Sequence, residues 1–212
     1  DLCEEPDWID PKFSNPTGKE LPVFPVKDES NYEDFINWLS FQSDLIKSLS
    51  EDKSYLRFIV EPIFKQKIID DKLTDEQIPI YKNRIDNELE VFELLDISSY
   101  MLITADFLNY ARRNNISIGI GRGSVGGSYI AYLLNIHGAD SIKYGLVFER
   151  FHNKLKKATS DIDNDIAPSG RDQVIKYVVN KYGAENVAHV SNFNKNTPKV
   201  YIKDISRACE FG

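Results

Sequence analysis

The sequence predicts an α/β fold in which a helical N-terminal layer packs on a mixed sheet. Apolar residues follow helical spacing up to about residue 113. Ile116, Ile118 and Ile120 then alternate with small residues, as in a strand. The run Asp161-Ile162-Asp163-Asn164-Asp165 alternates in the same way and predicts a second strand.

The chain has 212 residues and a hydrophobic content of 42%, enough for one large domain with its own core. It has no apolar run of about 18 residues and no secretory signal, so we expect a cytoplasmic protein without a membrane partner. Cys3 and Cys209 lack the spacing of metal ligands, which predicts free thiols. The missing initiator Met suggests a fragment.

The charge is unevenly spread along the chain. A net charge of −7 for the whole argues against a nucleic-acid binder. Residues 1–100 carry 11 basic and 23 acidic side chains, a net charge of −12, whereas residues 101–212 carry 15 basic and 10 acidic ones, a net charge of +5. The half with the alternating aspartates is therefore basic, which suits an anionic substrate held against a metal.

The N-terminal half is expected to be mainly helical. Residues 1–29 contain five prolines and predict an extended leader. Helices are expected from Ser30 to about Ser48, from Pro79 to Leu95 and from Tyr100 to Arg113. Residues 50–73 are ambiguous.

Three further helices are expected in the C-terminal half, over residues 129–134, from Ser169 to Gly183 and from Pro198 onward. Residues 187–190 are expected to form a short strand. The last helix carries three basic residues at four-residue spacing on one face, Lys199, Lys203 and Arg207.

Three carboxylates would line one face of the acidic strand, those of Asp161, Asp163 and Asp165, at a spacing of roughly 6–7 Å. Like charges so close repel one another, and beside apolar residues that face the other way they resemble half of a divalent-metal site. A solvated acidic loop is the alternative, and an isolated D-x-D-x-D pattern does not separate the two.

The glycine segment, residues 121–127, joins the first strand to a helix. Backbone N–H groups and the positive end of a helix would meet there, which predicts a phosphate site. Arg122 favours this over a purely structural turn, because an exposed guanidinium packs poorly and binds phosphate well. A dinucleotide-binding fold would need an acidic residue ending a second strand, and the one candidate, Asp140, lies in an expected loop. A P-loop is excluded because no Gly-Lys-Ser/Thr follows.

Four motifs follow one another in a fixed order. They are G-I-G-R-G-S-V-G-G-S-Y-I-A-Y-L-L, K-Y-G-L-V-F-E-R-F-H-N, D-I-D-N-D and R-D-Q-V-I-K-Y-V-V-N-K-Y-G. Together they resemble the palm of the catalytic alpha subunit of bacterial-type (family C) DNA polymerase III. The resemblance implies a polymerase-beta-like nucleotidyltransferase palm over residues 30–194. It also implies that residues 1–29 are the exit from a PHP domain and residues 195–212 the start of the thumb.

The same resemblance implies a replicative DNA-directed DNA polymerase that adds deoxynucleotides to a primer 3′-hydroxyl by a two-metal mechanism. Asp163 and Asp165 would be catalytic and would bind two Mg²⁺ ions, whereas Asp161 is not usually a ligand. The residues expected at the incoming triphosphate are Arg122, Gly123, Ser124 and Arg150. Those expected at the DNA backbone, unless they form only a solvated helix face, are Lys199, Lys203 and Arg207.

The implied partners are primer–template DNA, deoxynucleoside triphosphates and other replisome subunits. Asn164 stands where the family has an apolar residue, which favours a divergent member, bacterial or phage-encoded. Two other interpretations stay open: a different nucleotidyltransferase of the same superfamily, and a catalytically inactive nucleic-acid-binding module. Because the family's third catalytic carboxylate and fingers domain have no counterpart in these residues, we expect the 212 residues alone to be inactive.

Overall fold

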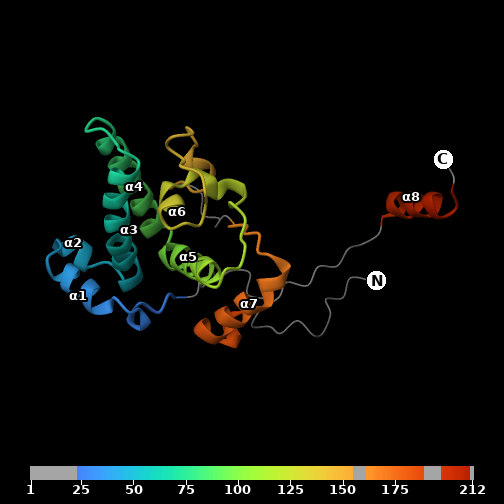
Figure 1. Cartoon of the computed structure of the whole chain (residues 1–212), viewed down its shortest axis with the longest axis horizontal. Coiled ribbons are helices and arrows are strands. Elements are labelled where there is room, and N and C mark those ends of the chain that lie inside the picture. Colours follow the sequence, from blue (N-terminus) through green and yellow to red (C-terminus); the bar gives the residue numbers. More distant parts are fainter. Residues whose placement is uncertain (1–22, 155–160, 189–196, 211–212) are drawn as a thin grey trace. The chain divides into compact units, whose positions relative to one another are not determined.

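The computed structural model describes residues 23–154, 161–188 and 197–210, which are mainly helical (Figure 1). The α-helices are α1 Tyr32–Ser40, α2 Asp44–Lys47, α3 Glu51–Asp70, α4 Gln77–Leu94, α5 Ser98–Arg113, α6 Tyr129–Leu133, α7 Pro168–Tyr182 and α8 Pro198–Ala208. Short 3-10 helices are η2 Val26–Asp28, η3 Gly123–Gly127, η4 Phe148–Arg150 and η5 Ala184–Asn186. The chain divides into two compact units, one up to Tyr177 and one from Val178, so the boundary lies within α7.

The predicted α/β palm with a mixed sheet is wrong for the described part of the chain. Its β pairing consists of two isolated antiparallel bridges, Ile118 with Ile166 and Arg122 with Asp163. The two segments expected to be strands therefore do lie against each other. They form no continuous ladder, and the described residues add no further strand to them.

A bulge explains why the pairing stays so short. The N–H of Gly119 donates to the carbonyl of Asp165 at 2.8 Å, and the N–H of Arg122 donates to that of Asp163 at 3.3 Å. From Gly119 to Arg122 the chain advances three residues, whereas the acidic segment advances only two between their hydrogen-bond partners. Gly121, with a φ of +100°, lies within the longer stretch. An extra residue of this kind breaks the ladder and bends the chain, and glycine tolerates the required φ.

Most of the predicted helices are confirmed. The expected helices at 79–95 and 100–113 correspond to α4 and α5. The helix expected over 30–48 is divided into α1 and α2. The ambiguous residues 50–73 contain the 20-residue helix α3, which has Pro62 inside it.

Helix α3 is the centre of the first unit. It contacts α1, α4, α5 and α6, and Figure 1 shows α3 and α4 side by side. Its Tyr55 meets the buried Phe35 of α1 edge to face, with ring centroids 5.4 Å apart, and Phe58 packs on the same ring at 5.7 Å. Aromatic pairs of this geometry stabilise a core beyond their buried area.

Two expectations fall at least partly outside the described residues. One is the extended leader over residues 1–22, and the other is the end of the strand expected over 187–190, at His189 and Val190. Within the described ranges, no helix is both long and apolar enough to cross a bilayer.

Candidate functional site

The acidic segment is extended, and its side chains alternate between solvent and protein. Asp161, Asp163 and Asp165 are exposed, whereas the residues between and after them, Ile162, Asn164 and Ile166, are half-buried. This is the alternation that the sequence predicts for an extended chain. The carboxylates are therefore available to a ligand from solution.

Contacts at both ends hold the acidic segment in place. The hydroxyl of Tyr100 on α5 accepts a hydrogen bond from the N–H of Ile162 at 3.1 Å. The N–H of Ala167 donates to the carbonyl of Ser117 at 2.9 Å. Burial raises the pKa of the Tyr100 hydroxyl, and the nearby charges of Asp161 and Asp163 add to that shift. Tyr100 thus stays protonated beside the aspartates.

The glycine segment lies directly against the aspartates. A Cβ built on Gly123 would lie 3.5 Å from Oδ2 of Asp163, so the bare backbone of this residue faces the carboxylate. Nη1 of Arg122 lies 3.3 Å from Oδ1 of Asp165, and both side chains are more than half exposed. Ser124 follows in η3 and is half-buried. The structure therefore brings Arg122, Gly123, Asp163 and Asp165 together.

The N-terminus of α6 does not face the aspartates with free N–H groups. The sequence predicted that this positive helix end would contribute to the phosphate site. The buried carboxylate of Glu88 on α4 accepts hydrogen bonds from the N–H groups of Tyr129 at 2.9 Å and Ile130 at 3.0 Å. It also accepts one from the hydroxyl of Ser128 at 2.7 Å. The first N–H groups of α6 are thus already paired within the protein. A phosphate would have to bind at residues 121–124 instead.

Arg84 completes this arrangement one turn earlier on α4. Its Nε donates to Glu88 at 2.6 Å, and its Nη2 donates to the carbonyls of Gly127 at 2.6 Å and Leu146 at 3.1 Å. Burial raises the pKa of the Glu88 carboxyl, while the four hydrogen bonds it accepts lower it. We call Arg84 and Glu88 the α4 clamp, because they join three separate segments of the chain.

The α4 clamp also positions the segment that carries Arg150. Phe148 and Phe151 are buried, and both pack edge to face on Phe92 of α4, at centroid distances of 5.8 and 6.4 Å. A Cβ on Gly127 would lie only 2.5 Å from the carbonyl oxygen of Val147, so η3 and η4 approach closely. With both phenylalanines turned inward, Arg150 is exposed next to the glycine segment.

His137 supports the glycine segment from within. Cβ atoms built on Gly121 and Gly126 would lie 2.7 Å from its Cδ2 and 2.9 Å from its Nε2. The N–H of Ala139 donates to Nδ1 of His137 at 3.0 Å, which fixes the ring. The glycines at these two positions are therefore needed because a side chain would collide with the imidazole.

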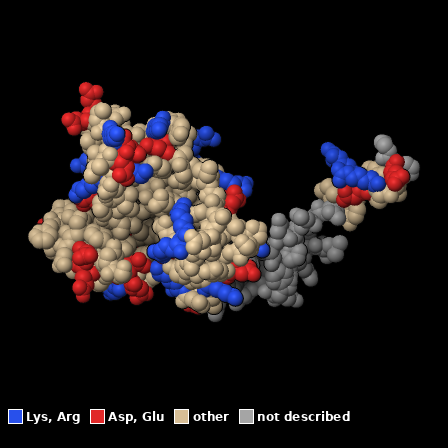
Figure 2. Space-filling model, in the orientation of Figure 1, with Lys and Arg blue, Asp and Glu red and all other residues tan. Residues whose placement is uncertain are grey.

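The three basic residues expected at DNA lie on α8, in the second unit. Figure 2 shows Lys and Arg side chains gathered along this helix. Lys199, Lys203 and Arg207 are all exposed, and Nη1 of Arg207 lies 3.9 Å from a carboxylate oxygen of Asp204. All three side chains are therefore accessible to an anion from solution.

The metal-binding capacity of the acidic segment is limited. In the described part of the chain, no group of three or more His, Cys, Asp or Glu side chains could hold a metal ion. Magnesium commonly binds through one or two carboxylates together with substrate phosphates and water. Asp163 and Asp165, beside a segment suited to phosphate, fit that kind of shared site.

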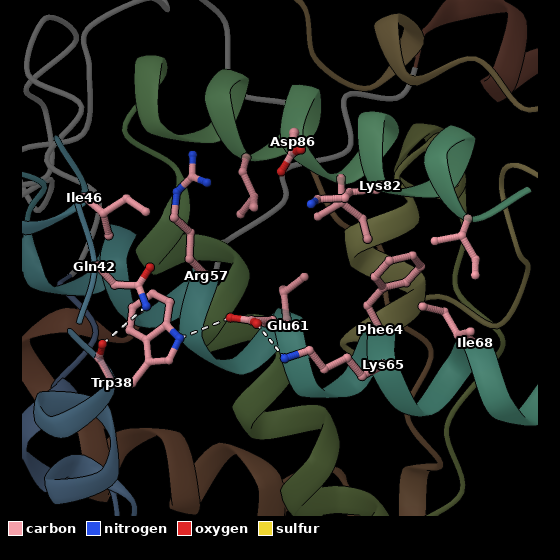
Figure 3. Close-up of a pocket in the computed structure, with 14 residues that line it drawn as sticks. Trp38, Gln42, Ile46, Arg57, Glu61, Phe64, Lys65, Ile68, Lys82 and Asp86 are labelled. Atoms are coloured by element: carbon pink, nitrogen blue, oxygen red, sulfur yellow. Dashed lines mark hydrogen bonds and ion pairs between the residues drawn. The ribbon is translucent and has the colours of Figure 1, made fainter. Parts of the chain in front are cut away.

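A cavity of about 460 Å³ lies elsewhere, between α1, α3 and α4 (Figure 3). Trp38 Nε1 donates to Glu61 at 3.1 Å, and Lys65 donates to the same carboxylate at 2.7 Å. Apolar residues such as Val60 and Phe64 line the cavity together with charged side chains of both signs. Two of its basic side chains are already paired, Arg57 with Glu93 and Lys65 with Glu61, so the size of the cavity alone does not make it the candidate site.

The sequence did not reveal the α4 clamp. An Arg–Glu pair four residues apart is common on exposed helix faces. The partners of Glu88 lie about 40 residues further on, in a segment expected to bind phosphate. Only the packing of α4 on α6 shows that this carboxylate is buried.

Replacing Glu88 should therefore unfold the site. Glu88→Ala leaves two buried N–H groups and the Arg84 guanidinium without their acceptor, and we expect a loss of about 3–5 kcal/mol in the free energy of unfolding. Chemical denaturation of the 212-residue chain measures it. Glu90→Ala is the matched control, because Glu90 is exposed and forms a surface ion pair with Lys154; it should change stability by less than about 0.5 kcal/mol. Equal stability of the two variants would contradict the assigned role.

Comparison with known proteins agrees with the four motifs. Residues 54–212 match the family model described as the bacterial DNA polymerase III alpha NTPase domain. The DNA polymerase III subunit alpha of Aquifex aeolicus is 40% identical over 162 residues, which is 76% of this chain and 14% of that protein. That of Neisseria meningitidis serogroup B is 36% identical over 190 residues, or 90% of this chain and 15% of that protein.

The DNA polymerase III subunit alpha of Ureaplasma parvum is 44% identical over 128 residues, 60% of this chain and 13% of that protein. The chain therefore spans about one seventh of the length of these relatives. The family model covers well over half of the chain. The chain belongs to the bacterial DNA polymerase III alpha NTPase domain family.

Proposed function

We propose that this chain forms the nucleotidyltransferase region of a replicative DNA polymerase, which adds deoxynucleotides to a primer 3′-hydroxyl. The observation that carries the proposal is the contact between the glycine segment and the acidic segment. It sets the backbone of Gly123 and the guanidinium of Arg122 against Asp163 and Asp165. Membership of the family and the printed names of the relatives support it. On this proposal, residues 30–194 are the palm, residues 1–29 lead into it and residues 195–212 begin the thumb.

The protein groups in this site would act by positioning and by neutralising charge. The exposed guanidinium of Arg122 can form two hydrogen bonds to a phosphate, and the N–H groups near Gly123 and Ser124 can donate to the same oxygens. Arg150, held outward by the two buried phenylalanines, would supply a second positive charge. Phosphoryl transfer depends mainly on such contacts.

Asp163 and Asp165 would hold the divalent cations that the resemblance implies, Mg²⁺ in the first place. Bound there, Mg²⁺ would lower the pKa of an attacking hydroxyl and stabilise a leaving pyrophosphate. The residues of this chain would keep the two carboxylates exposed on one side of the segment. The hydrogen bond from Ile162 to Tyr100 and that from Ala167 to Ser117 hold them there.

On this proposal, α8 contacts the DNA backbone through its basic face. Lys199, Lys203 and Arg207 follow at four-residue spacing, which places them on one side of the helix. Contacts of this kind lose affinity as salt concentration rises, because binding releases counterions from the phosphates. Primer–template DNA, deoxynucleoside triphosphates and other replisome subunits are the proposed partners, and the bacterial cytoplasm, of a host or of a phage-infected cell, is the proposed location.

Loss of either metal-binding carboxylate should abolish nucleotide addition. We expect Asp163→Asn and Asp165→Asn each to remove primer extension by the complete gene product that carries this sequence, with the fold unchanged or slightly more stable because repulsion is relieved. Asp161→Asn, two residues away on the same exposed side, is the matched control and should stay active. Near-normal extension by Asp163→Asn or Asp165→Asn would refute the metal assignment.

Arg122 should contribute to nucleotide binding more than to DNA binding. Charge-assisted contacts to phosphate are worth about 1.5–3 kcal/mol, so Arg122→Ala should weaken deoxynucleotide affinity by about tenfold or more. Filter binding of a labelled triphosphate measures the effect, and Arg171→Ala, another exposed arginine, serves as the control. Equal nucleotide affinity of both variants would exclude Arg122 from the phosphate site.

The 212 residues alone should not extend a primer. Two carboxylates hold a cation loosely, and an attacking hydroxyl must be fixed in line before transfer is fast. We expect the purified chain to bind Mn²⁺ only at high concentration and to leave a labelled primer–template unextended in a gel assay. Template-directed extension that disappears in Asp165→Asn would show that the chain already contains a complete active site.

A further inference from the structure

A second cavity, of about 360 Å³, lies between the end of α3, the start of α4, α6 and the loop that follows α6. Its volume is near the lower end of the range for small-ligand pockets. Three tyrosines line it, Tyr81, Tyr132 and Tyr144, together with the side chains of Gln77 and Asp71. We call it the tyrosine pocket. Such a lining offers aromatic faces and hydrogen-bonding groups at the same time.

Both carboxylates that line the tyrosine pocket have partners, and the third charged lining residue, Lys143, is exposed. Asp140 accepts hydrogen bonds from the hydroxyl of Tyr81 at 3.2 Å and from the N–H groups of Ile142 and Lys143 at 2.9 and 3.0 Å. Lys67 donates to the hydroxyl of Tyr132 at 2.9 Å and lies 3.9 Å from Asp71. The carboxylates are therefore compensated, and with the exposed Lys143 in the lining a polar group that is uncharged or negative fits the pocket better than a cation.

One polar atom beside the pocket lacks a partner. The hydroxyl of Tyr129 is fully buried and makes no hydrogen bond to any described residue. Its ring packs on the rings of two lining residues, Tyr81 at 5.1 Å and Tyr132 at 5.7 Å. Burial raises the pKa of this hydroxyl, and the negative charge of Asp140 adds to the shift. An unpaired buried hydroxyl is unfavourable. Because Tyr129 has no accessible surface and does not itself line the pocket, a ligand would reach this hydroxyl only after the ring of Tyr81 or Tyr132 moves aside.

The tyrosine pocket shares a wall with the glycine segment. Gly138 lines the pocket, and its N–H donates to the carbonyl of Ile120 at 2.7 Å. A Cβ on Gly138 would lie 2.7 Å from Cγ2 of Ile120, the residue just before Gly121. A molecule in the pocket thus lies next to the segment proposed to bind phosphate.

We propose that the tyrosine pocket binds a nucleobase. The exposed ring of Tyr144 would stack on the face of the base, since aromatic side chains stack on any base. The Gln77 amide would meet its polar edge, and so would the Tyr129 hydroxyl once the neighbouring ring moves. Oε1 of Gln77 already accepts from the N–H of Thr74 at 3.0 Å, which leaves the NH₂ group of Gln77 to donate to the base. The base comes either from a free nucleotide or from an unpaired DNA strand. Binding of the base does not depend on the proposed function. Only the role of that base in DNA synthesis rests on it.

Two fluorescent probes distinguish the two sources, because stacking on an aromatic side chain quenches 2-aminopurine. They are 2-aminopurine deoxyriboside and an oligo(dT) strand with one 2-aminopurine, each titrated with the 212-residue chain in the absence of divalent cations. Saturable quenching of the nucleoside would support a free nucleotide as the source. Saturable quenching of the oligonucleotide alone would support an unpaired strand. No saturable quenching of either probe would overturn the proposal.

Variants link the quenching to the pocket. Tyr144→Ala should weaken binding of the probe by about tenfold or more, while Phe41→Ala, a remote and more exposed aromatic residue, should leave it unchanged. Tyr129→Phe should weaken binding by about threefold or more, and without a probe its unfolding temperature should stay equal or rise, because an unpaired hydroxyl is removed. Unchanged binding in both tyrosine variants would overturn the proposal.

A repeat with Asp163→Asn keeps this test separate from the proposed function. Because Asp163 lies outside the pocket, the 212-residue chain with Asp163→Asn should still quench the probe. The same substitution in the complete gene product should abolish primer extension. Loss of quenching with Asp163→Asn would overturn the pocket as a separate base site. Failure of primer extension in the wild-type protein would weaken the proposed function and leave the base-binding result intact.

Discussion

A buried carboxylate at the start of a short helix holds the candidate site together. The carboxylate of Glu88 accepts hydrogen bonds from the first N–H groups of α6. Arg84, which pairs with Glu88, donates to the carbonyls of Gly127 and Leu146. The glycine segment ends where α6 begins, so its course is fixed from this end. The turn that carries Arg150 is fixed by the same guanidinium and by the aromatic packing on Phe92. The arrangement depends on pairing the buried carboxylate of Glu88 with these donors, because an unpaired buried charge is costly in a low-dielectric interior.

The sequence predicted local features of the site well. The alternation of aspartates gives an extended segment with its carboxylates in solvent, and the glycines mark the point where the backbone needs a positive φ, as at Gly121 and Gly123. These features follow from steric rules that act over a few residues. The helices α4 and α5 were predictable for the same reason, since their apolar residues repeat at helical spacing.

Local patterns could not predict that the described residues form no continuous sheet, nor could they predict the α4 clamp. Alternation shows that a segment is extended, but not how many neighbours it pairs with, and the bulge at Gly121 limits the pairing to two bridges. The burial of Glu88 depends on Ser128, Tyr129 and Ile130, which lie about 40 residues away in the sequence. Pro62 made α3 ambiguous, because proline disfavours helix interiors, yet the surrounding packing keeps the helix continuous.

The ion pair between Arg122 and Asp165 has a consequence for cooperativity. On the proposed assignment, Asp165 binds the cation and Arg122 binds the triphosphate. Binding of either ligand therefore breaks the same ion pair. Whichever binds first removes that cost for the second. Thermodynamic linkage makes the effect reciprocal. Since an exposed pair is worth at most about 1 kcal/mol, cation and nucleotide should each increase the affinity of the other by up to about fivefold, before any direct contact between them is counted.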